Sequence, residues 1–148
     1  MTPEEKARTV IDRLLAESGW TVQDKSAVNL AASRGVAVRE VSMKRGHGET
    51  DYLLFVDSKA IGTLEAKPEG FPLRGVALQS VKYSTGAPPG VPVWNIPLAF
   101  QYESTGTETL FTDRRDPNAC ARETFSFYRP ETLAQFAAEN DTLRARLR

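Results

Sequence analysis

The order of the segments along this chain predicts an α/β domain built on a mixed sheet. An amphipathic helix opens the sequence, three strand patterns follow directly, and two more helical segments alternate with further strand candidates. Such an order places helices against a sheet whose strands cannot all run in one direction. At 148 residues, the chain is long enough for one domain with its own core.

The first helix has clear start and stop signals. Thr2 is a good N-cap residue, Pro3 suits the first helical position, and Glu5 completes a capping box. Gly19 marks the C-terminal end, after which 20–22 lead into a polar loop. One face of the helix repeats apolar residues at helical spacing: Ala7, Val10, Ile11, Leu14 and Leu15.

Three strand patterns follow this helix. Residues 36–43 alternate between apolar and polar, with a slip of phase between Val38 and Val41 that indicates a bulge. The glycine-containing loop 45–49 then feeds two apolar runs, 50–57 and 60–67, which are close enough in sequence to form a hairpin.

The second half of the chain predicts a helix, short strands and a final helix. The helix spans 73–84 and ends near Gly86. The strand candidates are 91–96, 97–102 and 108–112, and the last helix begins near Pro130. The charged residues 141–148 suggest a connector to a further part of a longer chain.

Three charged residues lie at neighbouring ends of the predicted hairpin. Glu65 and Lys67 are two apart, so they project from one face of their strand. Asp51 begins the preceding strand and returns beside Glu65 when the hairpin closes. Two carboxylates and an ammonium group are a minimal set for binding a divalent metal against a phosphate and placing a water molecule to attack it.

The hairpin register decides whether this cluster forms. A two-residue loop at 58–59 would set Asp51 opposite Ala66, and Asp51 would then point away from Glu65. A three-residue loop at 57–59 would set Asp51 opposite Glu65, and a bulge can do the same. We therefore predict the three-residue register or a bulge.

Composition limits the classes of function. Apolar residues make up 41% of the chain and charged residues 26%, which is typical of a globular protein. No apolar run is long enough for a transmembrane helix, and no apolar signal segment opens the chain, so we expect a cytoplasmic protein without membrane contact. The single cysteine excludes an internal disulfide. A net charge of zero counts against an autonomous, tight DNA binder.

The charged residues also resemble a known family. Asp51 followed by Glu65-Ala66-Lys67 resembles the PD-(D/E)xK nuclease motif, with Thr50 in place of the usual proline. Gln79 and Tyr83 resemble the QxxxY motif that follows it in some branches. Their order and spacing are similar to the N-terminal endonuclease domain of the restriction (R) subunit of type I restriction-modification enzymes. The resemblance spans roughly 4–130.

This resemblance implies a restriction-endonuclease-like mixed central sheet flanked by helices. It also implies that 1–148 is a single nuclease domain and an N-terminal fragment of a larger motor subunit. The implied activity is Mg²⁺-dependent hydrolysis of double-stranded DNA, with Mn²⁺ as a substitute metal and ATP used only by the missing motor. The implied partners are DNA and the modification and specificity subunits of the full enzyme.

The chemistry of phosphodiester hydrolysis and the resemblance together assign roles to six residues. Asp51 and Glu65, with the backbone carbonyl of Ala66, are the expected metal ligands. Lys67 is expected beside the attacking water, where it lowers the pKa of that water or stabilises charge on the phosphate. Gln79 and Tyr83, four apart on a helix, are expected to contact DNA or support the site.

Other interpretations of the same residues stay open. Asp51 and Glu65 can be ordinary strand-end carboxylates paired with nearby lysines. A nuclease-like domain can serve only as a docking or structural module, and a stand-alone DNA repair nuclease is a third alternative. His47 and Cys120 are more simply explained as a loop residue and a passive thiol.

Overall fold

The computed structural model describes residues 1–95, 97–116 and 118–139, except for the side chains of Leu78 and Gln79. The proposed connector at 141–148 lies outside the described residues. The helices are α1 (Pro3–Glu17), α2 (Leu73–Gln79) and α3 (Pro130–Ala138), with short 3-10 helices η1 (Lys25–Ala27) and η2 (Ser80–Thr85). The strands are β1 (Trp20–Asp24), β2 (Gly35–Ser42), β3 (Glu49–Val56), β4 (Lys59–Ala66), β5 (Phe100–Ser104), β6 (Thr109–Asp113) and β7 (Arg122–Glu123).

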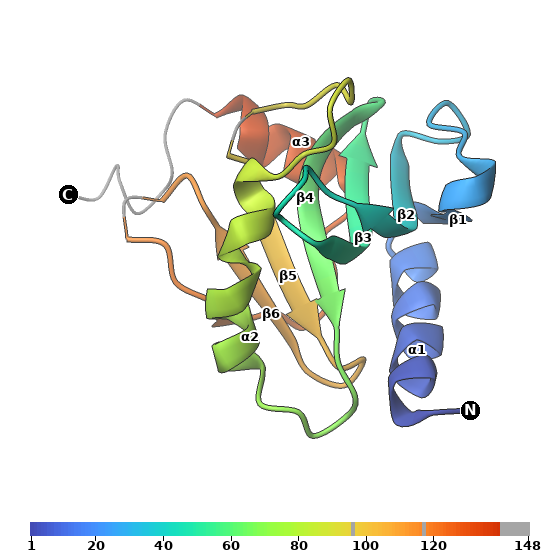
Figure 1. Cartoon of the computed structure of the whole chain (residues 1–148), viewed down its shortest axis with the longest axis vertical. Coiled ribbons are helices and arrows are strands. Elements are labelled where there is room, and N and C mark those ends of the chain that lie inside the picture. The colour runs from blue at the N-terminus through green and yellow to red at the C-terminus, as the bar shows by residue number, and fades with distance from the viewer. Residues whose placement is uncertain (96, 117, 140–148) are drawn as a thin grey trace.

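The strands form one mixed sheet of seven strands in the order β1-β2-β3-β4-β5-β6-β7 (Figure 1). β2, β3 and β4 form an antiparallel meander, whereas β1 pairs with β2, and β4 with β5, in parallel. The crossover from β4 to β5 carries α2 and η2. The predicted α/β class and mixed sheet are therefore confirmed.

Helices cover both faces of this sheet. On one face α1 and α3 pack against the larger core, which includes Ile11, Tyr52, Phe100 and Leu133. On the other face, Tyr83 of η2 packs with apolar residues of β2 and β3. In Figure 1, α2 lies in front of the sheet and α3 lies behind it. No described helix is long and apolar enough to cross a membrane.

The N-terminal prediction is confirmed in detail. The Thr2 hydroxyl accepts a hydrogen bond from the Glu5 N–H, the Glu5 carboxylate accepts one from the Thr2 N–H, and α1 ends before Gly19, whose φ is +92°. Residues 20–22 were expected only to lead into a polar loop, whereas residues 20–24 form the strand β1. Apolar and polar residues alternate poorly in this edge strand, so its strand conformation depends on its pairing with β2 and not on its own sequence pattern.

The second half differs from the sequence prediction in three places. The helix expected over 73–84 ends at Gln79 and continues as the 3-10 helix η2. In the candidate strand 91–96, the described residues make only an isolated bridge, Ala60 with Val93. β5 begins at Phe100, so the strand expected over 97–102 is displaced towards the C-terminus. Two prolines, at 92 and 97, lack the N–H that a regular strand needs.

Gly62 controls the pairing of β4 with β5. A Cβ atom at this position would lie 2.6 Å from the backbone carbonyl oxygen of Phe100, which cannot move without breaking the sheet. We expect Gly62→Ala to lower the free energy of unfolding by about 1–3 kcal/mol, measured by urea denaturation. The matched control is Gly75→Ala in α2, where no atom lies within 4 Å of the added Cβ. Better helix propensity should leave that variant as stable as the wild type, or about 0.5–1 kcal/mol more stable. Equal losses in both variants would contradict this explanation.

Candidate functional site

The β3–β4 hairpin contains the bulge that the site requires. Its tight turn is Asp57-Ser58, with φ of +52° and +65°, and it pairs Val56 with Lys59. The register then shifts by one residue between Phe55 and Leu54, so that Tyr52 pairs with Leu64. The turn has two residues, as in one of the loops considered from the sequence, but it lies one residue earlier, at 57–58, and the predicted bulge is confirmed. Continuing the shifted register sets Asp51 opposite Glu65.

Asp51 and Glu65 are joined by hydrogen bonds across the strand ends. The Asp51 backbone N–H donates to Glu65 Oε1 at 3.2 Å, and the Ala66 backbone N–H donates to Asp51 Oδ2 at 2.8 Å. Each carboxylate is therefore positioned by the backbone beside the other. The bulge and these two bonds bring together the residues that the sequence proposed as a pair.

Burial makes it difficult to ionise Glu65. Its side chain is almost buried, and this desolvation, followed by the negative charge of Asp51, raises the pKa of Glu65 to about 8. The nearby charge of Lys67 opposes this shift. At neutral pH Glu65 is therefore protonated for much of the time, and a cation bound there would replace this proton.

Arg8 of α1 already contacts this carboxylate pair. Its guanidinium forms a close ion pair with Asp51 and a second one, at 2.8 Å, with Glu40. Glu40 lies on β2 opposite Asp51, between the pairs Arg39–Tyr52 and Val41–Thr50, and has a φ of +57°. This left-handed backbone is uncommon for a glutamate and interrupts the regular strand. Neither Arg8 nor Glu40 was assigned a role from the sequence.

Lys67 and Tyr83 lie near the carboxylates. The Lys67 Nζ lies 5.4 Å from the centroid of the Phe71 ring, and among the described residues it forms no ion pair within 4 Å. Tyr83 is buried; this burial, then the charges of Glu65 and Asp51, raises its pKa to about 12. Its phenol therefore stays protonated at neutral pH and can donate a hydrogen bond towards the site.

Gln79 and Tyr83 do not share a continuous α-helix. Gln79 is the last residue of α2, whereas Tyr83 belongs to η2, whose 3-10 geometry places residues four apart differently. The expected common α-helical face is therefore wrong. The position of the Gln79 side chain lies outside the described part of the structure.

Glu103 is a third acidic residue that the sequence analysis missed. It pairs with Glu65 across β4 and β5, is fully buried, and neither carboxylate oxygen accepts a hydrogen bond from the described residues. Its polar neighbours are used elsewhere, since Ser80 Oγ donates to the Val76 carbonyl and Gln101 Nε2 to that of Ala77. Burial raises the pKa of Glu103 to about 7, against the opposing effects of Gln101, Arg114 and Ser80.

The raised pKa of Glu103 predicts a pH-dependent stability. The folded-state pKa of Glu103 exceeds its unfolded value. Protonated Glu103 therefore stabilises the folded state fully at low pH, and this contribution is lost as pH rises through about 7. We expect Glu103→Gln to gain stability over the wild type by on the order of 2 kcal/mol at pH 8.5, and much less at pH 5. Urea denaturation at both pH values would measure this difference. A constant difference at the two pH values would contradict it.

The residues around Asp51 suit a hard divalent cation. Carboxylate and carbonyl oxygens are the ligands that Mg²⁺ prefers. The N–H and C=O of one strand residue point towards the same neighbouring strand, so the Ala66 carbonyl faces the strand of Asp51. In the described part of the chain, no three His, Cys, Asp or Glu side chains are grouped to hold a metal. The donor set is therefore two carboxylates and one carbonyl, with Arg8 beside them.

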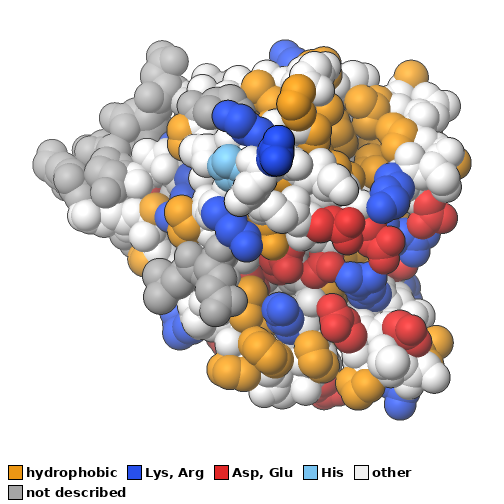
Figure 2. Space-filling view, viewed as in Figure 1, with side chains coloured by type: hydrophobic (Ala, Val, Ile, Leu, Met, Phe, Trp, Pro, Cys, Tyr) orange, Lys and Arg blue, Asp and Glu red, His pale blue; other side chains and the backbone are white. Residues whose placement is uncertain are grey.

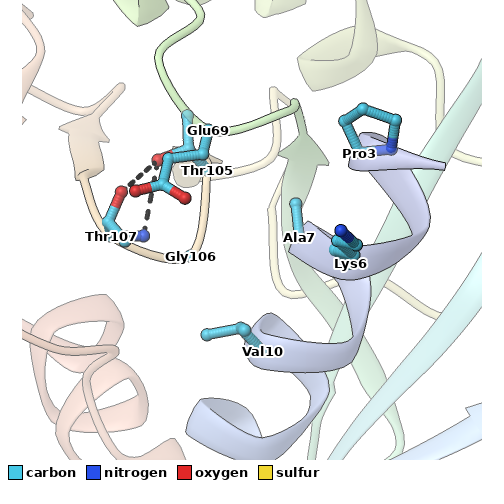
Figure 3. Close-up of a pocket in the computed structure, with 8 residues that line it drawn as sticks. All are labelled: Pro3, Lys6, Ala7, Val10, Glu69, Thr105, Gly106 and Thr107. Atoms are coloured by element: carbon cyan, nitrogen blue, oxygen red, sulfur yellow. Dashed lines mark hydrogen bonds between the residues drawn. The ribbon is translucent and has the colours of Figure 1, made fainter. Parts of the chain in front are cut away.

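A separate hollow of about 270 Å³ lies between α1 and the turn that joins β5 to β6 (Figure 3). Lys6, Ala7 and Val10 face it from the helix, and Thr105 and Thr107 from the turn. Asp51, Glu65 and Lys67 do not line this hollow, so it is not a part of the carboxylate site.

Comparison of the chain with protein-family models, with curated proteins and with solved structures finds no significant match to any of them. Arguments about its function therefore rest on the geometry above.

Proposed function

We propose that this chain is a metal-dependent DNA endonuclease domain with a restriction-endonuclease-like fold. The observation that carries the proposal is the bulge in β4, which sets Asp51 opposite Glu65 at the ends of two central strands. The hydrogen bonds across the pair and the raised pKa of Glu65 add support, because two acidic side chains placed this close together can be ionised together more easily when a divalent cation binds them.

The chain's own groups fit the needs of phosphodiester hydrolysis. Asp51, Glu65 and the Ala66 carbonyl would hold Mg²⁺, which when bound supplies a Lewis acid for the scissile phosphate. Lys67, with no ion-pair partner among the described residues, has its ammonium available to orient a water molecule or stabilise a phosphate oxygen. Tyr83 supplies a protonated phenol on the same side.

The surface of the domain favours delivery of DNA by partners. Figure 2 shows acidic and basic side chains intermixed over one face, and the net charge of the chain is zero. Such a surface lacks the excess of positive charge that drives autonomous DNA binding. We therefore propose that the domain works as part of a type I restriction enzyme in the cytoplasm, with a motor region and the modification and specificity subunits delivering double-stranded DNA.

One observation favours a second function, a non-catalytic docking or structural module. Arg8 occupies one oxygen of Asp51 and bridges it to Glu40, so the charge of Asp51 already has a partner without a metal. On this interpretation, the acidic residues anchor α1 to the sheet. A metal can bind only if it competes with Arg8 for Asp51.

A crystal soaked in about 10 mM Mn²⁺ and measured by anomalous scattering separates the two functions. The nuclease proposal predicts a peak between Asp51 and Glu65, with the Arg8 guanidinium displaced from Asp51 and still paired with Glu40. We also expect Arg8→Ala to bind Mn²⁺ several-fold more tightly in solution, because one competing cation is removed. No peak in either protein, with Arg8 still on Asp51 in the wild type, would support the structural module.

A further inference from the structure

A second pocket, the arginine pocket, lies between α2, the end of β6 and residues 119–121. Its volume is about 270 Å³, and it shares no residue with the carboxylate site. Two basic side chains enter it, over a floor made mainly of small apolar groups. The pocket is lined by Arg74, Ala77, Thr112, Arg114, Ala119, Cys120 and Ala121.

The two guanidinium groups of this pocket lack a counter-ion. Among the described residues, no Asp or Glu lines the pocket, and neither Arg74 nor Arg114 forms an ion pair within 4.0 Å. Ion pairs are common elsewhere on the chain; they involve Arg8, Arg13, Arg34, Arg39, Arg115 and Arg129. Two like charges that share one small pocket repel each other, and an anion between them would remove that cost.

Arg114 is held in place by buried groups. Its Nε donates to Gln101 Oε1 at 3.2 Å, and Gln101, only 2% exposed, donates in turn to the Ala77 carbonyl at 2.7 Å. The terminal nitrogens of Arg114 make no hydrogen bond to the described residues, so both can donate to a ligand. Arg74 makes one long bond, from Nη1 to the Ala121 carbonyl at 3.3 Å.

One acidic residue approaches the pocket from inside the sheet. The positive charge of Arg114 lowers the pKa of Glu103, so the two groups interact electrostatically, although no ion pair joins them within 4.0 Å. Burial raises the pKa of Glu103 to about 7, so it is about half ionised near neutral pH and compensates the two arginines only in part. The pocket therefore stays positive.

We propose that the arginine pocket binds a phosphate group. Guanidinium groups match the oxygens of a tetrahedral phosphate with paired hydrogen bonds, and the small apolar floor lowers the local dielectric and strengthens this contact. The same chemistry fits free inorganic phosphate and a backbone phosphate of DNA. The inference does not depend on the carboxylate site.

Cys120 gives a direct test, since it lines the pocket and is the only cysteine in the chain. The rate of its alkylation by iodoacetamide, a neutral reagent, is measured while inorganic phosphate replaces chloride at constant ionic strength. We expect saturable protection in the wild type and in Arg13→Ala, an arginine on α1 outside the pocket. Arg74→Ala, an exposed position, should weaken phosphate binding by about tenfold, and Arg114→Lys, which keeps the charge but loses the fork, by a similar factor.

Protection that does not saturate, or that is equal in Arg74→Ala and the wild type, would overturn the proposal. A short DNA duplex distinguishes the sources. Protection by the duplex that is lost in Arg74→Ala assigns the pocket to backbone phosphate, whereas protection by phosphate alone assigns it to the free ion. Asp51→Asn should keep the protection, so that failure of the nuclease proposal and failure of this one are separable.

Discussion

Asp51→Ala is expected to lose both metal binding and DNA cleavage, whereas Lys67→Ala is expected to lose cleavage alone. Asp51 contributes a ligand oxygen and also fixes the Ala66 backbone through the 2.8 Å hydrogen bond. Its removal should weaken Mn²⁺ binding by about 100-fold, measured by calorimetry. Lys67 carries no ligand oxygen, so its loss should leave Mn²⁺ affinity within a few-fold while cleavage falls by about 100-fold or more.

Cleavage is best measured with the domain in its assembled enzyme, where translocation and folding give internal controls. Both variants should translocate DNA normally and unfold cooperatively. Lys59→Ala is a matched control. Lys59 is the first residue of β4, at the end of the strand opposite to the site, and its ammonium group lies over the Trp94 ring. Loss of translocation in both site variants would contradict the assigned roles, as would unchanged cleavage in Lys67→Ala.

Metal binding is expected to weaken steeply as the pH falls below about 8. Glu65 must lose its proton to act as a ligand, and burial beside Asp51 raises its pKa to about 8. About half of Glu65 is ionised at pH 8 and about 1% at pH 6, so Mn²⁺ affinity should fall by about 50-fold between these pH values. Calorimetry in two buffers of different ionisation enthalpy would also show about one proton released for each ion bound at low pH.

Glu65→Gln provides the control for this pH dependence. The amide cannot ionise, so the variant should bind Mn²⁺ weakly at every pH and release no proton. A rise in pH has opposite effects on the two properties: it strengthens metal binding but lowers the stability of the metal-free protein. Because the folded-state pKa exceeds the unfolded value, the stabilising effect of protonated Glu65 is lost as pH rises through about 8. A wild-type affinity that does not change between pH 6 and pH 8 would contradict this account.

The local patterns in the sequence predicted the first helix, the hairpin and the carboxylate pair. The capping box and Gly19 act within a few residues, so their signals are complete in the sequence. The bulge was required by the need to place Asp51 beside Glu65, yet the pattern did not say which residues would form the turn. Asp57 and Ser58 adopt positive φ without a glycine, and this is why the two-residue turn was not assigned there.

The missed residues depend on distant parts of the chain. Arg8 meets Asp51 only because α1 packs against the sheet, and no spacing in the sequence encodes that contact. Glu40 had a signal, since the phase slip between Val38 and Val41 surrounds it, but the slip did not identify its partner. Glu103 also had one: the alternation Phe100-Gln101-Tyr102-Glu103 places two polar residues on a single buried face.

The bulge at the centre of the hairpin makes the length of the chain part of the chemistry. One residue fewer in β3 between Asp51 and Phe55, with the bulge retained, would set Asp51 against Leu64, with every side chain of the site still present in the sequence. Such a protein would look intact to any comparison that scores only substitutions. In β3, the loss of a single residue is therefore expected to damage the site as much as the loss of a carboxylate.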